Sequence, residues 1–192
     1  MLTMFLPDNQ EARYRGLRMT ADDYLAAQDD GHRYELINGV VCMSPSPSRP
    51  HQKVIGEIHR QLANFLVRRP IGEAIVEVDV RLAEDLVYRP DVVFVSAEKA
   101  AHCGARITVV PDLVVEVISP DSRRYDHETK KGDYERCGIR EYWLVDPEKR
   151  EFVFYRLEDG RYIRVSPSGD TFASQTIPGF ELDLRQVSSV FG

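Results

Sequence analysis

Apolar residues recur along the chain with two different periods, and the changes between them mark the predicted elements. From His51 to about Arg68 they follow helical spacing, which predicts one long amphipathic helix. After Gly72 the period becomes two, so EAIVEVDVRLA and YRPDVVFVS are predicted strands with a turn around Asp85. The middle of the chain therefore predicts a helix followed by strands.

Shorter signals precede this helix. Thr20, followed by acidic residues, is typical of a helix N-cap and predicts a short helix over residues 20–29. The pair Asn38-Gly39 separates two apolar runs and predicts a tight hairpin. Residues 44–50, rich in Ser and Pro, are predicted as a loop.

The second half of the chain repeats the alternation of strand and helix. Residues 97–110 are expected to form a loop with a helical turn, DLVVEVIS a strand, and DHETKKGDYERCG a helix that Asp126 caps and Gly138 ends. EYWLVDP, EFVFYRL and RYIRVS are expected to be antiparallel strands, with FELDL a last short one. The pattern predicts a mixed α/β domain whose central sheet, expected to be mixed, is flanked by helices.

Composition limits the classes of protein that fit. A chain of 192 residues with 43% hydrophobic residues is expected to form a single domain over residues 1–192. The net charge of -6 argues against a protein that coats nucleic acid with basic surface, although a local basic patch remains compatible. Three widely spaced cysteines and the lack of a long apolar run favour a reduced, cytoplasmic protein without a membrane span.

Two acidic residues interrupt apolar strands. Glu116 lies in the middle of DLVVEVIS, where Val114 and Ile118 share its face, and Asp91 opens the apolar run of YRPDVVFVS. A buried carboxylate is unfavourable unless it is paired or binds a cation. On adjacent strands, the two would suit a hard divalent cation such as magnesium, whereas a structural ion pair for Glu116 and a turn role for Asp91 are the simpler alternatives.

The helix after Glu116 can supply a positive charge. Asp126, Lys130 and Tyr134 follow each other at intervals of four and lie close to one helical face, although periodicity alone does not separate Lys130 from Lys131. Arg123 and Arg124 make the preceding loop basic, which would suit a phosphate.

These segments resemble a known family. YELINGVV, HQKVIGEIHRQL, YRPDVVFVS and the strand, loop and helix that end in EYWLVDP are similar, in order and spacing, to the Uma family of restriction-endonuclease-like proteins, a branch of the PD-(D/E)XK nuclease superfamily. The resemblance covers roughly residues 18–188 and implies a restriction-endonuclease-like core with additional antiparallel strands and a metal-dependent phosphodiesterase site.

The resemblance also implies roles for individual residues. Asp91 matches the aspartate of the PD element, Glu116 matches the acidic residue of the (D/E)XK element, and Glu35 matches an additional acid that many relatives bring to the metal. Ile118 stands where the superfamily pattern has lysine, and Lys130 matches the helical position to which the family moves it.

The positions of three further residues bear on their roles. Glu35 lies in a hairpin strand, where an acid usually faces solvent. Asp112 also follows a proline, but it is four residues from Glu116, about 13 Å along a strand, so Asp91 is preferred. His51 begins the long helix, where it either contacts substrate phosphate or caps the helix.

The sequence therefore predicts an endonuclease that uses Mg²⁺ or Mn²⁺ to hydrolyse nucleic acid, with DNA as the expected substrate. Asp91, Glu116 and Glu35 would hold the metal, Lys130 would complete the catalytic set, and His51, Arg123 and Arg124 would contact phosphate. A homodimer is expected, because nucleases of the restriction type often cut one strand with each copy. The alternatives are a binding module that keeps the nuclease fold without turnover and a structural protein with a buried Glu–Lys pair.

Overall fold

The computed structural model describes residues 12–44, 46–119 and 125–191, and within these ranges the strands form three sheets. There, the large sheet has six strands in the order β10-β9-β8-β7-β6-β3, the small sheet has four in the order β2-β1-β5-β4, and β11 and β12 pair with each other. The strands are β1 Tyr34–Ile37, β2 Val40–Met43, β3 Gly72–Val76, β4 Val80–Ala83, β5 Leu86–Tyr88, β6 Val92–Ser96, β7 Leu113–Val117, β8 Glu141–Asp146, β9 Glu151–Glu158, β10 Arg161–Val165, β11 Thr171–Ala173 and β12 Glu181–Asp183. The helical elements are α1 Ala21–Ala26, α2 Arg49–Arg68, α3 Ala97–Ala100, the π-helical turn η1 Tyr125–Lys130, α4 Lys131–Cys137 and α5 Leu184–Ser189.

The large sheet is mixed, as the sequence predicts. Strands β7 and β8 run parallel, while the other neighbouring pairs are antiparallel. The parallel pair needs a crossover between its strands, and η1 with α4 supplies it. This crossover brings the helix that follows Glu116 back onto the sheet.

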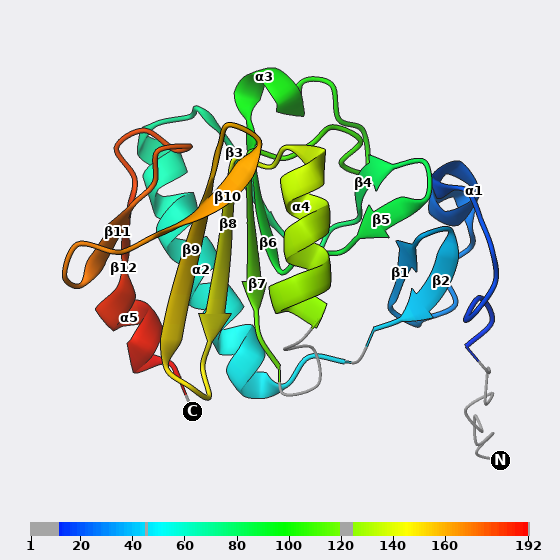
Figure 1. Cartoon of the computed structure of the whole chain (residues 1–192), viewed down its shortest axis with the longest axis horizontal. Helices are drawn as coiled ribbons and strands as arrows, with labels where there is room; N and C mark the ends of the chain where they lie inside the picture. Colours follow the sequence, from blue (N-terminus) through cyan, green and yellow to red (C-terminus); the bar gives the residue numbers. More distant parts are fainter. Residues whose placement is uncertain (1–11, 45, 120–124, 192) are drawn as a thin grey trace, which may run out of the picture.

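Both faces of the large sheet are buried (Figure 1). Helix α2 packs on one face, where Leu113, Val115 and Val117 of β7 belong to the core. Helix α4 covers the other face, where Val114 and Ile118 join a second core with Tyr134. The predicted alternation along β7 is therefore confirmed, and Glu116 shares the face of α4.

Two predicted strands are each divided between the large and small sheets. EAIVEVDVRLA forms β3, which pairs with β6, and then β4, which pairs with β5. The chain turns between them at Glu77, whose φ of 50° lies in the left-handed region. YRPDVVFVS is divided into β5 and β6 around Pro90, which has no N–H to donate to a sheet. Period-two patterning predicts both strands but does not reveal that the chain changes sheet.

Local signals gave correct elements near the N-terminus. Thr20 caps α1 by accepting a hydrogen bond from Asp23 N, and Asn38 and Gly39 have the positive φ angles of the predicted hairpin turn.

The helix after β7 begins at Tyr125, so Asp126 lies inside η1 and does not precede the helix as a cap would. The side chain of Asp126 lies outside the description. Gly138 ends α4 with a φ of 82°. The sequence did not predict the short elements β11 and α5.

Glu141 anchors the C-terminal ribbon to the large sheet. Its carboxylate is fully buried and accepts hydrogen bonds from Trp143 Nε1, Ser174 Oγ and the backbone N–H groups of Gln175 and Thr176, at 2.7 to 3.2 Å. A buried carboxylate needs such donors because it has lost its hydration. These hydrogen bonds therefore account for the burial of Glu141.

The described part of the chain contains no helix that is long and apolar enough to cross a membrane. Cys42, Cys103 and Cys137 all carry unbridged thiols.

Candidate active site

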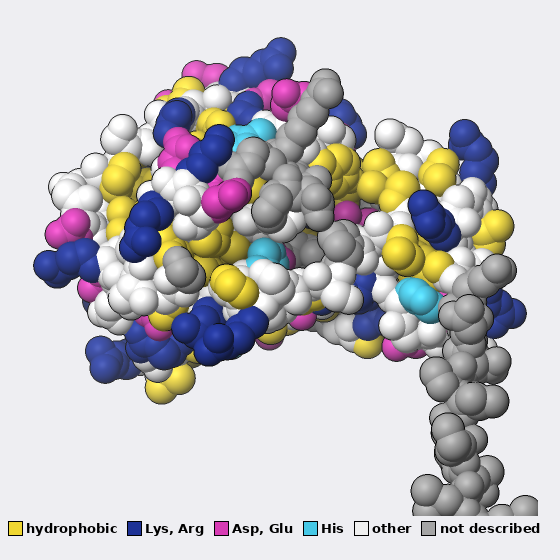
Figure 2. All heavy atoms as spheres, turned by 90° about the horizontal axis from the view of Figure 1, so that it is seen from below, with side chains coloured by type: hydrophobic (Ala, Val, Ile, Leu, Met, Phe, Trp, Pro, Cys, Tyr) yellow, Lys and Arg dark blue, Asp and Glu magenta, His cyan; other side chains and the backbone are white. Residues whose placement is uncertain are grey.

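A cavity of about 400 Å³ lies where the hairpin β1–β2, the start of α2 and the end of β7 meet. It is lined by side chains from segments that are far apart in sequence, among them Glu35, His51, Asp91, Glu116 and Lys130. Figure 2 views the molecule from this side and shows a hollow between the larger body and the small sheet. Of the predicted site residues, the structure thus brings these five to one cavity.

Asp91 and Glu116 come from neighbouring strands. Val92 of β6 pairs with Val115 of β7, and continuing this antiparallel register by one residue sets Asp91 opposite Glu116. Residues directly opposite each other in a sheet carry their side chains on the same face. Asp91 Oδ2 also accepts a hydrogen bond of 2.6 Å from Val117 N, which fixes the aspartate against the end of β7. Both carboxylates are buried.

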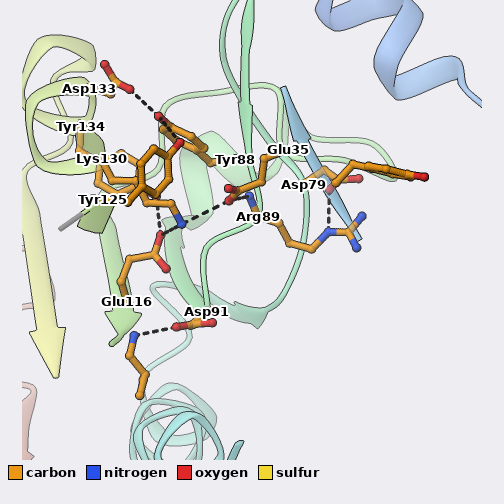
Figure 3. A network of polar contacts seen from close by, with 12 residues as sticks. Glu35, Asp79, Tyr88, Arg89, Asp91, Glu116, Tyr125, Lys130, Asp133 and Tyr134 are labelled. Carbon is orange, nitrogen blue, oxygen red and sulfur yellow. Dashed lines mark hydrogen bonds and ion pairs between the residues drawn. The ribbon is translucent and has the colours of Figure 1, made fainter. Parts of the chain in front are cut away.

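Glu116 is held from the side of the crossover helix (Figure 3). Its Oε1 atom accepts hydrogen bonds from Lys130 Nζ at 2.9 Å and from Tyr134 Oη at 2.6 Å. The sequence predicts that Lys130 and Tyr134 lie on one helical face, and both indeed reach the same oxygen. Burial and the neighbouring Glu116 charge raise the pKa of Tyr134 well above its ordinary value, so this phenol stays a hydrogen-bond donor.

Glu35 joins the same cluster from the small sheet. It is buried rather than facing solvent, and its Oε1 atom lies 3.2 Å from Lys130 Nζ and accepts a 3.1 Å hydrogen bond from Arg89 N. Lys130 therefore bridges two carboxylates from two different sheets. A single ammonium between two buried acids offsets charge that the interior would otherwise disfavour.

The geometry separates Lys130 from its rival Lys131. Lys130 is 6% exposed, and its ammonium also lies over the rings of Tyr88 and Tyr125, at 5.3 and 5.7 Å. Lys131 has other neighbours, with Nζ 4.9 Å from the ring centre of Tyr155 and 4.0 Å from Glu135. Only Lys130 reaches the cavity.

His51 approaches Asp91 from the first turn of α2. Its Nε2 atom lies 3.3 Å from Asp91 Oδ2. Burial alone would lower the pKa of His51, but the hydrogen bond and charge of Asp91 outweigh it and raise the pKa above its ordinary value. The contact with Asp91 therefore favours the positively charged form of His51, which lines the cavity.

Sequence reasoning missed a group of tyrosines behind Lys130. Tyr125 Oη donates to Tyr88 Oη at 3.1 Å, and Tyr88 Oη donates to Asp133 Oδ2 at 2.5 Å. Burial raises the pKa of both phenols. Tyr125 also lines the cavity. Tyr88 lies close before Asp91 in the sequence, but no sequence pattern connects Tyr125 with Glu116.

Arg33 was also missed. It lines the cavity, and its NH1 group donates to Glu77 at 2.8 Å. Its Nε atom is buried and has no hydrogen-bond partner among the described residues. A basic residue just before a hairpin strand gives no sequence signal of such a position.

Asp112 lies at the other end of β7 and has a structural environment. It accepts hydrogen bonds from Lys99 Nζ at 2.8 Å and from Ser96 N at 2.9 Å. Arg123 and Arg124, which the sequence suggests for phosphate contact, lie outside the described residues.

The donor set bears on metal binding. Among the residues that the structure describes, no group of three or more His, Cys, Asp or Glu side chains is arranged to hold a metal ion. Asp91 and Glu116 offer hard oxygen donors at one cavity. The contacts of Asp91 with Val117 N and with His51 Nε2 both use Oδ2. A magnesium ion needs only one or two protein carboxylates when substrate phosphate and water complete its shell.

Comparisons with known proteins bear on the family and the fold. The model of the family described as "Uma2: Putative restriction endonuclease" matches residues 21–185. A crystal structure of a putative nuclease belonging to DUF820, from Anabaena variabilis ATCC 29413, superimposes with a TM-score of 0.76 at 18% sequence identity. That match covers 90% of this chain and 99% of the other. Among curated proteins, none matches.

Proposed function

Because the chain belongs to the Uma2 family of putative restriction endonucleases, we propose that it is a metal-dependent endonuclease that hydrolyses phosphodiester bonds in DNA. The observation that carries the proposal is the meeting of Asp91 and Glu116, buried on neighbouring strands, at a cavity that also receives Lys130. The fold and the family alone would leave the site unassigned.

The residues present fit Mg²⁺ or Mn²⁺. Asp91 and Glu116 would hold the ion, and Glu35 would assist from the small sheet. Carboxylate oxygens suit these hard cations, and a site with two carboxylates leaves positions for a phosphate oxygen and for water. When bound, such an ion makes water a better nucleophile and offsets negative charge on the phosphate.

The remaining roles follow from the contacts of the chain itself. Lys130 carries an ammonium beside Glu116 and Glu35, where it would orient the attacking water or stabilise charge that develops on the phosphate. Tyr134 holds Glu116 in position through a hydrogen bond to the same oxygen. His51 and Arg33, at the cavity wall, would contact substrate phosphate.

The proposal is tested by nicking of supercoiled plasmid with Mg²⁺, Mn²⁺ or EDTA. We expect nicking that EDTA abolishes and that Glu116→Gln and Asp91→Asn each reduce by at least about 100-fold. The matched control is Glu181→Gln, an exposed acid in β12. Unchanged nicking by a folded, highly purified Glu116→Gln protein would contradict these roles.

A binding module without turnover is the second candidate. It is favoured by Ile118, which is buried in the core at the position where the superfamily has lysine. In that case Mg²⁺ would raise the melting temperature, while no DNA or RNA would be cut. The same variants decide between the nuclease and the binding module. For a binding module, Glu116→Gln would abolish the rise in melting temperature with Mg²⁺, and there would be no nicking activity to lose.

We also propose that the protein acts as a homodimer in the cytoplasm. The three unbridged thiols are compatible with a reducing compartment. Light scattering coupled to size exclusion would show the mass of a dimer or of a single chain.

A further inference from the structure

A second, smaller cavity lies in the small sheet beside the candidate active site. Its volume is about 100 Å³, and tyrosine, aspartate and arginine side chains make up most of its lining. Ligand pockets for whole drug-sized molecules are about 300 to 1,000 Å³, so this one is of a size for a fragment such as one nucleobase.

Two arginines are fixed at this cavity by one buried aspartate. Asp79 is 5% exposed; its Oδ1 accepts a 2.8 Å hydrogen bond from Arg89 Nε, and its Oδ2 lies 3.2 Å from Arg106 Nε. Across the described ranges, the terminal nitrogens of neither arginine have a hydrogen-bond partner. Figure 3 shows those of Arg89 pointing away from Glu116. Both guanidinium groups are thus held by one edge and present donors at the other.

The walls are aromatic, and their hydroxyl groups are already used. Tyr24 Oη donates to Tyr34 O at 2.7 Å, and Tyr34 Oη donates to Asp30 Oδ2 at 2.9 Å. The Tyr34 ring packs edge-on against Tyr14 and is tilted against His32, with centroids 5.9 and 6.0 Å away. The rings are therefore held in fixed positions at the cavity wall.

The charge of the lining argues against a phosphate as the occupant. Two arginines line the cavity together with three aspartates, Asp29, Asp30 and Asp79, so positive charge does not dominate. A dianionic group would meet these carboxylates, whereas a neutral ring with both donors and acceptors can pair with both kinds of side chain.

We propose that this cavity binds a guanine base. Guanine presents the acceptors O6 and N7 side by side, which is the pair that an arginine fork recognises. Its N1–H and amino groups are donors, and Asp29, whose Oδ1 accepts from Gly31 N, has Oδ2 available at the rim. Adenine and cytosine carry an amino group in place of the O6 acceptor, and thymine lacks the N7 acceptor.

The position of the cavity connects this base to the cleavage site. Arg89 and Tyr34 line both cavities, and Arg89 N donates to Glu35 in the candidate active site. A base in the smaller cavity would belong to a nucleotide near the phosphate that is cut. This second step rests on the proposed function, whereas guanine binding does not.

Isothermal titration with dGMP, dAMP, dCMP and TMP in EDTA tests the proposal. The four nucleotides share the deoxyribose and the phosphate and differ only in the base. We expect dGMP to bind at least about 10-fold more tightly than the others. Equal affinities for the four nucleotides would overturn the proposal.

Variants of Arg106 locate the effect. Arg106 is about half exposed, so Arg106→Ala is expected to fold and to lose the preference for dGMP; Arg106→Lys, which keeps the charge but not the fork, is expected to lose it as well. Arg164→Ala removes an exposed arginine of β10 and should leave the preference intact. A preference that survives in both Arg106 variants would contradict the assignment of this cavity.

Mapping of cut sites keeps this proposal separate from the proposed function. Guanine enriched at a fixed position near the cut, and lost in Arg106→Ala, would support both. Selective dGMP binding without cleavage would leave the base pocket standing and remove the nuclease proposal. Cleavage with equal nucleotide affinities and no base enrichment at the cut would support the nuclease proposal and remove the guanine pocket.

Discussion

Replacing Lys130 with methionine should destabilise the protein far more than the same change at the neighbouring Lys131. The side chain of methionine is close to lysine in length, so the change removes the ammonium with little loss of volume. Lys130 Nζ lies 2.9 Å from Glu116 and 3.2 Å from Glu35, and all three side chains are buried. Its removal leaves two carboxylates without the cation that bridges them.

The magnitude follows from this burial. Removing one partner of a buried ion pair costs about 3 to 5 kcal/mol, because the remaining charge loses a counter-charge at a place that water reaches poorly. In a chain of this size each kcal/mol shifts the melting temperature by about 2 to 4 °C, so Lys130→Met should lower it by roughly 6 to 20 °C. Lys131 is partly exposed and packs on Tyr155, a contact of about 0.5 to 1 kcal/mol, which predicts a shift of at most about 4 °C.

The assay is thermal unfolding followed by circular dichroism, with urea unfolding as a second measure. EDTA is present throughout, because a cation bound between the carboxylates could compensate for the missing ammonium. If Lys130→Met and Lys131→Met melt within about 2 °C of each other, the buried acids do not depend on Lys130 and the reasoning is wrong.

Three further predictions concern residues away from the cavity. Glu141→Gln should destabilise the protein by about 2 to 4 kcal/mol in urea unfolding, because an amide cannot accept all the hydrogen bonds of the carboxylate, and should leave the response to Mg²⁺ unchanged. Burial raises the pKa of Asp112, but hydrogen bonds from Lys99 and from a backbone N–H outweigh it and hold the pKa below its ordinary value, so Asp112 stabilises the fold above about pH 4 and this contribution is lost as the pH falls through the lowered pKa. Asp112→Asn should therefore be less stable than wild type at pH 7, with a difference that shrinks in acid unfolding series toward pH 3. Gly72→Ala should lower stability by about 1 to 3 kcal/mol, since the added Cβ would overlap Val95 O across the β3–β6 pair, and normal melting of this variant would contradict that packing.

The fold was predictable where local rules decide the structure. The alternation around Glu116 gave both buried faces of β7, and the turn residues Asn38 and Gly39 gave the hairpin. What the local pattern could not give was the change of sheet at Glu77 and Pro90, because a strand that pairs with one neighbour and a strand that pairs with another have the same alternation. Such changes depend on contacts between distant segments.

The site divides in the same way. An acid inside an apolar strand is visible in the sequence, so Asp91 and Glu116 could be found by their cost of burial. Glu35 could not be found this way, because its carboxylate contacts Lys130 and Arg89, which come from distant segments of the chain. Tyr125 gave no periodic signal either, because the π-helical turn that carries it departs from the spacing of an α-helix.

The π-helical turn also explains how a lysine on a helix can serve an acid on a strand. Lys130 ends η1 and Lys131 begins α4, yet their ammonium groups contact different residues, one Glu116 and the other Tyr155. The strand position two residues after Glu116 is Ile118, which is buried in the core under α4 and contributes apolar contact there. A helix that covers this face closely enough to bury Ile118 also brings its first turn within reach of Glu116. The same packing that buries Ile118 thus places the Lys130 ammonium beside Glu116, whose charge is balanced from the helix and not from its own strand.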